Sequence, residues 1–97
     1  MYSIQYLPLA RDDFDQSFDW YACRSTVAAT RFADAVAAVM ERISIDPRRL
    51  TFVDAVHQEC SLRHFPFRVI FRHLDDHVLI VAISHAKRRP AFWRGRK

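Results

Sequence analysis

The side chains of this chain that could do chemistry are concentrated at its C-terminal end. Residues 85–97 carry six basic side chains and no acidic one. They account for the whole net charge of +4, because residues 1–84 hold nine basic and eleven acidic side chains. A block of this kind attracts polyanions, either nucleic acid or an acidic protein segment. The six basic residues are Lys87, Arg88, Arg89, Arg94, Arg96 and Lys97.

Three other residues of this block suit more than one task. His85 could act as a general acid–base, because an imidazole titrates near neutral pH, but we favour a histidine that holds the chain end by hydrogen bonding. Phe92 and Trp93 could stack on nucleic-acid bases. For these rings we favour a packing role, in which they pin the chain end to the core.

The four other histidines and the two cysteines have no metal-binding spacing, so we predict neither a metal nor another cofactor. Cys23 and Cys60 lie far apart, and the N-terminus has no feature typical of an export signal. We therefore predict reduced thiols in a cytoplasmic protein, with a disulfide as the less favoured alternative. No apolar run approaches the ~20 residues that span a bilayer, so no membrane association is predicted.

Apolar periodicity predicts an N-terminal strand followed by a helix. Residues 2–7 alternate between apolar and polar side chains, which indicates a strand that ends at Pro8. Residues 9–23 have helical periodicity, with Asp12 and Asp13 in the first turn, where negative charge suits the helix dipole. The apolar stripe of this helix consists of Phe14, Phe18 and Tyr21.

A second helix follows after a short link. Ser25 or Thr26 can cap its N-terminus, and Asp46-Pro47 stops it. Two amphipathic helices with so short a connection form an antiparallel hairpin. The apolar stripe of the second helix consists of Ala29, Phe32, Val36, Val39 or Met40, and Ile43.

Three strands are predicted for the C-terminal half, over residues 60–65, 67–74 and 77–84, after a loop that leads into the first. The last is apolar on both faces, which is typical of a strand inside a sheet. The chain is therefore predicted to be one α+β domain, residues 1–97. In this domain an N-terminal strand and an antiparallel two-helix hairpin precede a three-stranded antiparallel meander, and the helices pack on one face of the sheet.

Three pieces of the sequence, in this order and spacing, resemble the RelE/ParE superfamily of toxins from type II toxin–antitoxin modules. The first is Asp46-Pro47 after the helical hairpin. The second is LRHFPFRVIF at residues 62–71, which is similar to the family stretch Arg-x-x-x-Phe-Pro-Tyr-x-Ile-x-Tyr. The third is AISHAKRRPAFW at residues 82–93, which is similar to Val-x-His-x-x-Arg-x-Pro-x-Tyr-Trp. The resemblance covers nearly the whole chain.

The resemblance implies a growth-inhibiting toxin of the plasmid stabilisation type. RelE-like members cut messenger RNA on the ribosome, whereas ParE-like members poison DNA gyrase. Both kinds are neutralised by an antitoxin whose disordered C-terminal segment folds upon the toxin. The expected partners are therefore a cognate antitoxin, in a heteromeric complex, and either gyrase or the ribosome with its mRNA.

The resemblance also implies site residues. The family's basic site falls on Arg68 and Arg88, which could hold a phosphate bidentately or stabilise a developing phosphorane, with His85 as the acid or base. The alternative for Arg68 is a solvated strand face. Antitoxin or target binding is expected at Arg63 and along the C-terminal block. The residues of that block that we expect to bind are Lys87, Arg88, Arg89, Trp93, Arg94 and Arg96.

The sequence departs from the nuclease pattern of the superfamily. No lysine precedes Lys87 and no tyrosine follows Tyr21, so the lysine-based centre and the C-terminal tyrosine are both missing. Phe92 or Trp93 stands near the place of that tyrosine and cannot exchange a proton. These departures favour a ParE-like toxin over a RelE-type mRNA endonuclease, which is the one enzyme activity that the resemblance allows. A non-toxic basic module that binds nucleic acid is the third interpretation.

Overall fold

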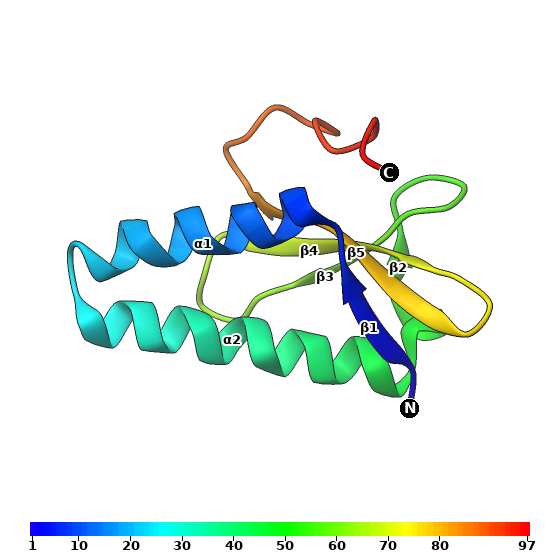
Figure 1. Cartoon of the computed structure of the whole chain (residues 1–97), viewed down its shortest axis with the longest axis horizontal. Coiled ribbons are helices and arrows are strands. Elements are labelled where there is room, and N and C mark those ends of the chain that lie inside the picture. The colour runs from blue at the N-terminus through cyan, green and yellow to red at the C-terminus, as the bar shows by residue number, and fades with distance from the viewer.

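The structure is a computed structural model that describes residues 1–97, and it consists of a helical hairpin on one face of a five-stranded sheet (Figure 1). This confirms the predicted α+β fold. The helices are α1 (Pro8–Ala22) and α2 (Thr26–Ile45), and a 3₁₀ turn, η1 (Pro47–Arg49), follows them. The strands are β1 (Ser3–Tyr6), β2 (Thr51–Phe52), β3 (Gln58–Ser61), β4 (Phe67–His73) and β5 (His77–His85).

Both helices begin and end close to the predicted positions. Pro8 is the first residue of α1, where its missing N–H costs nothing. Ser25 caps α2, since its Oγ accepts a hydrogen bond from Ala28 N at 3.1 Å. The two predicted stripes meet in the main core. Neither α1 nor α2 has the length and hydrophobicity of a membrane-spanning helix. The buried stripe residues of α2 are Ala29, Phe32, Val36, Val39 and Ile43.

The sheet is mixed, with the strand order β1-β5-β4-β3-β2. The meander from β2 to β5 is antiparallel, whereas β1 runs parallel to β5 and pairs with it from Ser3–His77 to Tyr6–Ile80. Because β5 has a neighbour on each side, the prediction that this doubly apolar strand lies inside the sheet is confirmed. The parallel placement of β1 was not part of the prediction.

The strand predicted over residues 60–65 is wrong in its bounds. The observed strand, β3, covers Gln58–Ser61, and the chain then turns, with His64 in the left-handed backbone region at a φ of 66°. Leu62 and Phe65 both pack into the main core. Residues three apart point to opposite faces of a strand, so only a turn can bring these two side chains to the same core.

A bulge in β5 divides its apolar side chains between the two faces of the sheet. Ile70 pairs with Ala82 while Phe71 pairs with Ile80, so Val81 is the extra residue. Ile80 therefore packs in the core beneath the helices, whereas Val81 and Ala82 belong to a second cluster. This second cluster gives the C-terminal residues a surface on which to pack.

The C-terminal tail, residues 86–97, crosses over the sheet and packs on this second cluster (Figure 1). Trp93 is only 4% exposed and packs with Ile70, Val81 and Ala82, while Phe92 lies partly buried beside them. The packing role favoured for these two rings is thereby confirmed. The tail is part of the folded domain and not an appendage.

The two cysteines lie in different environments, which leads to a reactivity prediction. Cys23 is exposed and Cys60 is buried, and both are free thiols. Burial raises the pKa of the Cys60 thiol, which lowers its thiolate population further. In the native protein a thiol reagent is expected to label Cys23 quickly and Cys60 only after denaturant is added. A Cys23→Ser variant that still labels quickly without denaturant would contradict this assignment.

Candidate functional site

A groove of about 360 Å³ lies between α1 and the end of β5, where the tail leaves the sheet. We call it the α1–β5 groove. It combines aromatic walls with polar groups and contains two of the predicted site residues, His85 and Arg88. Its lining residues are Asp13, Gln16, Ser17, Trp20, Tyr21, Phe67, Ile83, His85 and Arg88.

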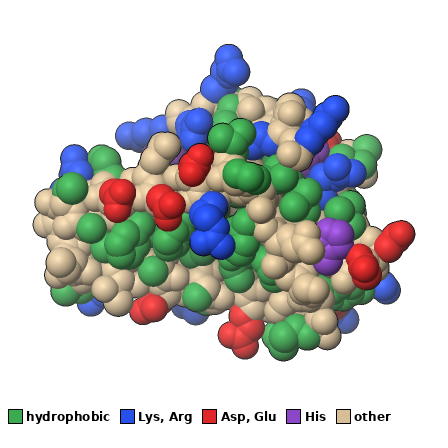
Figure 2. Space-filling model, in the orientation of Figure 1, with side chains coloured by type: hydrophobic (Ala, Val, Ile, Leu, Met, Phe, Trp, Pro, Cys, Tyr) green, Lys and Arg blue, Asp and Glu red, His purple; other side chains and the backbone are tan.

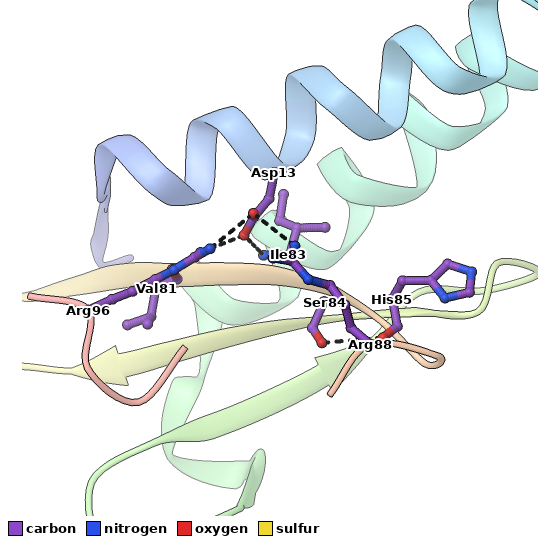
Figure 3. A network of polar contacts seen from close by, with 7 residues as sticks. All are labelled: Asp13, Val81, Ile83, Ser84, His85, Arg88 and Arg96. Atoms are coloured by element: carbon purple, nitrogen blue, oxygen red, sulfur yellow. Dashed lines mark hydrogen bonds and ion pairs between the residues drawn. The ribbon is translucent and has the colours of Figure 1, made fainter. Parts of the chain in front are cut away.

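At the base of this groove, Asp13 is the centre of a polar network (Figure 3). Two nitrogens of Arg96 donate to its two carboxylate oxygens, at 2.6 and 3.2 Å, and Ile83 N donates to Oδ2 at 3.1 Å. Arg88 Nη1 lies 3.6 Å from Oδ1. The Asp13 and Arg96 side chains are only 6% and 11% exposed. This carboxylate therefore ties α1, β5 and the tail together.

The network compensates for the shortness of β1. That strand pairs with β5 only as far as Ile80, so the next part of the β5 edge has no neighbouring strand. There Asp13 accepts the hydrogen bond of Ile83 N, and Arg96 Nη1 donates to Val81 O at 3.0 Å. A buried backbone group without a partner is costly, so this ion pair satisfies groups that a longer β1 would otherwise bind.

Arg88 lies at the boundary between this network and the open groove. Besides its contact with Asp13, its guanidinium stacks over the Phe92 ring, 3.8 Å from the ring centroid. About half of the Arg88 side chain is exposed. A guanidinium held by a carboxylate and a ring on one side can still present donors to an anion on the other side.

His85 closes the same groove and is held on two sides. Its Nδ1 accepts a hydrogen bond from Lys87 N at 3.0 Å, and its ring packs edge-on to Phe67 with centroids 4.8 Å apart. Since Nδ1 is an acceptor, the neutral ring carries its proton on Nε2. These contacts fit the favoured interpretation of a histidine that holds the start of the tail.

Two of the other arginines predicted for the site, Arg68 and Arg63, lie outside this groove. Arg68 lines a separate hollow, and its Nη1 donates to Glu59 Oε1 at 2.9 Å. Arg63 lies in the turn after β3 and lines a groove beside α2. The fold thus brings His85 and Arg88 together in one groove and places Arg68 and Arg63 in others.

A family model for the ParE toxin of the type II toxin–antitoxin system, parDE, matches residues 4–90. This chain belongs to the ParE toxin family. A comparison with curated proteins gave no match.

Solved structures of toxins have the same fold as this ParE-family chain. A chain of the chromosomal ParDE TA system from P. aeruginosa superposes with a TM-score of 0.77 at 16% identity, and the match covers 90% of this chain and 98% of that one. The isolated E. coli RelE toxin superposes with a TM-score of 0.59 at 13% identity, and the match covers 98% and 95% of the two chains. At these identities the similarity shows the fold alone.

The tail of this ParE-family toxin has a second tether, at the turn between β2 and β3. Asp54 Oδ2 lies 3.5 Å from Arg94 Nε, and the His57 ring packs against Trp93 at a tilt of 55°, with centroids 4.7 Å apart. Asp54 accepts hydrogen bonds from Val56 N and His57 N, and these bonds lower the pKa of its carboxyl to about 2. The turn is thus stabilised by an ionised carboxylate that also holds the tail.

Asp54→Asn is expected to destabilise the ParE-family toxin in a pH-dependent way. A carboxyl whose pKa is lowered on folding contributes stability above its unfolded pKa near 4 and loses that contribution as the pH falls towards 2. At pH 7 the variant should lose about 1 kcal/mol of unfolding free energy, and near pH 2 it should match the wild type. Urea unfolding across this range measures the difference, with Asp75→Asn as the control. A deficit that does not change with pH would contradict this role.

Half of the basic residues of the block are ion-paired within the ParE-family domain, three guanidinium groups sharing two carboxylates. Three of its arginines pair with Asp13 or Asp54. Figure 2 shows Lys and Arg side chains along the side of the molecule where the tail lies. The basic tail residues that form no ion pair and are exposed are Lys87, Arg89 and Lys97. The predicted partner-binding role of the tail remains a prediction, and Trp93 is buried beneath the surface that a partner would contact.

Sequence reasoning missed the residues that organise this ParE-family site. Asp13 was expected to act on the helix dipole, but α1 begins one residue earlier than predicted, and no acidic residue lies in its first turn. Its position within the stripe of Ala10, Phe14 and Tyr21 was the available signal, since a carboxylate on an apolar stripe needs a buried partner. Trp20, on the rim of the groove, gave no such signal.

Proposed function

We propose that this ParE-family chain arrests bacterial growth by inhibiting DNA gyrase and that a cognate antitoxin neutralises it. Family membership supports a toxin, and one observation favours gyrase over mRNA cleavage. Of the three candidate catalytic side chains, His85 and Arg88 line the α1–β5 groove, whereas Arg68 lines an adjoining hollow and is paired with Glu59. Both candidate targets are cytoplasmic, so the proposal places the toxin in the cytoplasm.

The chemistry of RNA cleavage makes this separation important. A nuclease must place its acid, its base and its phosphate-binding cations within hydrogen-bond reach of one phosphate. Here Arg68 is paired with Glu59, and Arg88 contacts Asp13. No lysine precedes Lys87 to take over the role of Arg68. Inhibition through binding has no such requirement.

The antitoxin surface that we propose joins the α1–β5 groove to the free cations of the tail. Lys87 and Arg89, which flank the groove residue Arg88 in the sequence, are exposed and unpaired, and Trp20 in the groove lining is 54% exposed. An acidic amphipathic segment could place apolar side chains against the indole and carboxylates against the cations. Binding of this kind would cover the tail and the groove together.

The target can be tested with purified toxin. Supercoiling by DNA gyrase should decrease as the toxin concentration increases, and mRNA in a coupled ribosomal translation reaction should stay intact. A mapped set of new RNA cleavage ends, lost in His85→Ala, would overturn the gyrase proposal. Such a result would establish the second candidate, an mRNA endonuclease, which the shared position of His85 and Arg88 in one groove favours.

The antitoxin surface needs a matched pair of variants. Lys87→Ala with Arg89→Ala removes two unpaired cations from the tail, whereas Arg11→Ala with Arg31→Ala removes two exposed cations from the helices. Affinity for the cognate antitoxin should weaken about tenfold or more in the first variant and stay near wild type in the second. Equal binding by both variants would contradict the proposed surface.

A further inference from the structure

A second hollow lies at the end of β4 that is remote from the α1–β5 groove. It has a volume of about 430 Å³ and lies between η1, the β2–β3 hairpin and the last residues of β4. This volume is within the range of pockets that hold small organic ligands. The lining residues that matter for its chemistry are Arg48, Phe52, Val56, Gln58, Arg72 and His73.

The strand register places three of these side chains on one face of the sheet. Phe52 pairs with Gln58, and Gln58 pairs with Phe71, which packs in the main core beneath the helices. Paired residues of adjacent antiparallel strands point to the same face, and so do residues two apart in one strand. His73, two residues after Phe71, therefore lies on the same face as Phe52 and Gln58.

The turn η1 brings Arg48 to this face. The Gln58 side chain is buried, and its Nε2 donates to Pro47 O at 2.7 Å and to Leu50 O at 3.0 Å. These two bonds fix the backbone on both sides of Arg48. The Arg48 side chain is exposed and forms no ion pair, and its one hydrogen bond runs from Nη2 to Tyr2 Oη at 3.2 Å. Most of its donors are therefore free at the hollow.

Tyr2 connects this guanidinium to His73. The Tyr2 ring packs edge-on to the His73 ring with centroids 4.6 Å apart, while its hydroxyl accepts from Arg48. His73 Nε2 is buried and has no hydrogen-bond partner. Buried polar atoms are rarely left unpaired, so this nitrogen and the free guanidinium point to an acceptor that binds near both.

The charge of the hollow fits an anion with two negative charges. None of its lining residues is acidic. Arg72 also lines it and forms neither an ion pair nor a side-chain hydrogen bond. Arg72 alternates with His73 along the strand and points to the opposite face, so we assign it an effect through charge and no contact. A dianion would compensate Arg48 and Arg72 together, whereas a single carboxylate would compensate only one of them.

The rim of the hollow supplies an apolar surface next to these polar groups. Phe52 and Val56 are 57% and 48% exposed. An exposed phenyl ring offers its face to a flat ring of a ligand, and the contact removes apolar surface of both from water. The hollow thus combines an anion site with a place for a flat apolar body.

We propose that this hollow binds a small phosphate monoester with a flat ring, such as a nucleoside monophosphate. The Arg48 guanidinium and the Nε2–H of His73 donate to the phosphate oxygens, and the ring of the ligand packs on Phe52 and Val56. The site is separate from the α1–β5 groove and from the tail. It does not depend on the identity of the toxin's target.

The surroundings of the hollow favour one phosphate over a nucleic-acid backbone. Asp54 precedes the lining segment of the β2–β3 turn, and Asp76 lies in the turn after His73. Hydrogen bonds from Val56 N and His57 N lower the pKa of Asp54, and the hydrogen bond with His77 lowers that of Asp76, so both are ionised at neutral pH. A chain of phosphates that continued past the hollow would meet these negative charges, whereas a single phosphate would not.

The test is isothermal titration calorimetry of the full chain with adenosine monophosphate. The wild type should bind with a dissociation constant below about 1 mM. Arg48→Ala and His73→Phe should each weaken binding roughly tenfold or more, the cost of losing a charge-assisted hydrogen bond. His73→Gln should keep most of the affinity, because its amide N–H can replace the Nε2–H. Arg49→Ala is the matched control. Arg49 is exposed and adjacent, but it pairs with Asp46 at 3.2 Å and does not line the hollow, so its loss should change affinity less than about twofold.

The other ligands in the titration separate the proposal from its competitors. Adenosine, inorganic phosphate and benzoate should all bind more weakly than adenosine monophosphate, because each lacks the phosphate, the ring or the second charge. Equal affinity for any of the three would overturn the proposed ligand class, and so would tighter binding of a single-stranded oligonucleotide per nucleotide. Equal affinity of Arg48→Ala and Arg49→Ala, or no binding by the wild type, would overturn the site. If His73→Phe fails to fold, the exposed Arg48 variant still decides the result.

Discussion

Asp13→Ala is expected to lower the free energy of unfolding by about 3–5 kcal/mol, which is the usual cost of removing one partner of a buried ion pair. The change would leave the buried Arg96 guanidinium without its carboxylate and Ile83 N without an acceptor. It would also release the end of the tail from α1. Urea unfolding followed by circular dichroism measures this loss.

Two companion variants distinguish the network from a general effect of charge. Asp12→Ala removes an exposed carboxylate from the same turn of α1 and should leave stability within about 0.5 kcal/mol of the wild type. Asp13→Asn keeps an oxygen that can accept from Ile83 N but loses the ion pairs, so its stability should lie between those of the other two. Equal stabilities of Asp12→Ala and Asp13→Ala would show that the network contributes nothing.

Trp93→Ala should cost about 3–5 kcal/mol, which is typical of a large ring removed from a well-packed site. The ring fills the second cluster on β4 and β5 and packs against His57, so its loss exposes apolar strand surface and weakens both tail tethers. Thermal unfolding should show a lower Tm, and limited proteolysis should cut the tail before the sheet unfolds.

Trp20→Ala is the matched control, because this second tryptophan is 54% exposed. It should change stability much less than Trp93→Ala. In the Trp20→Phe background the fluorescence of Trp93 alone reports whether the tail is docked. An early shift of that fluorescence in mild denaturant, before the helical signal changes, would show that the tail detaches as a separate unit. Similar losses for both tryptophan variants would contradict the buried role of Trp93.

The sequence by itself determined most elements of the fold, because these depend on local patterns, although the short strand β2 was predicted as loop. Apolar stripes and the Ser25 cap predicted the helical hairpin to within about one residue at its ends. The two apolar faces of β5 predicted its place inside the sheet. The strand over residues 60–65 was misplaced, since local periodicity could not show that Leu62 and Phe65 pack into one core.

Tertiary structure alone decided the arrangement of the site. Charge counting predicted a basic block that attracts polyanions, but it could not show that Arg88, Arg94 and Arg96 are paired inside the domain. Asp13 and Arg96 are separated by 83 positions, and they meet because β1 is too short to cover the edge of β5. Local spacing predicted the end of β1 before Pro8, but it encodes neither the register of β1 on β5 nor the path of the tail. An ion pair that depends on both can be found only once the chain is folded.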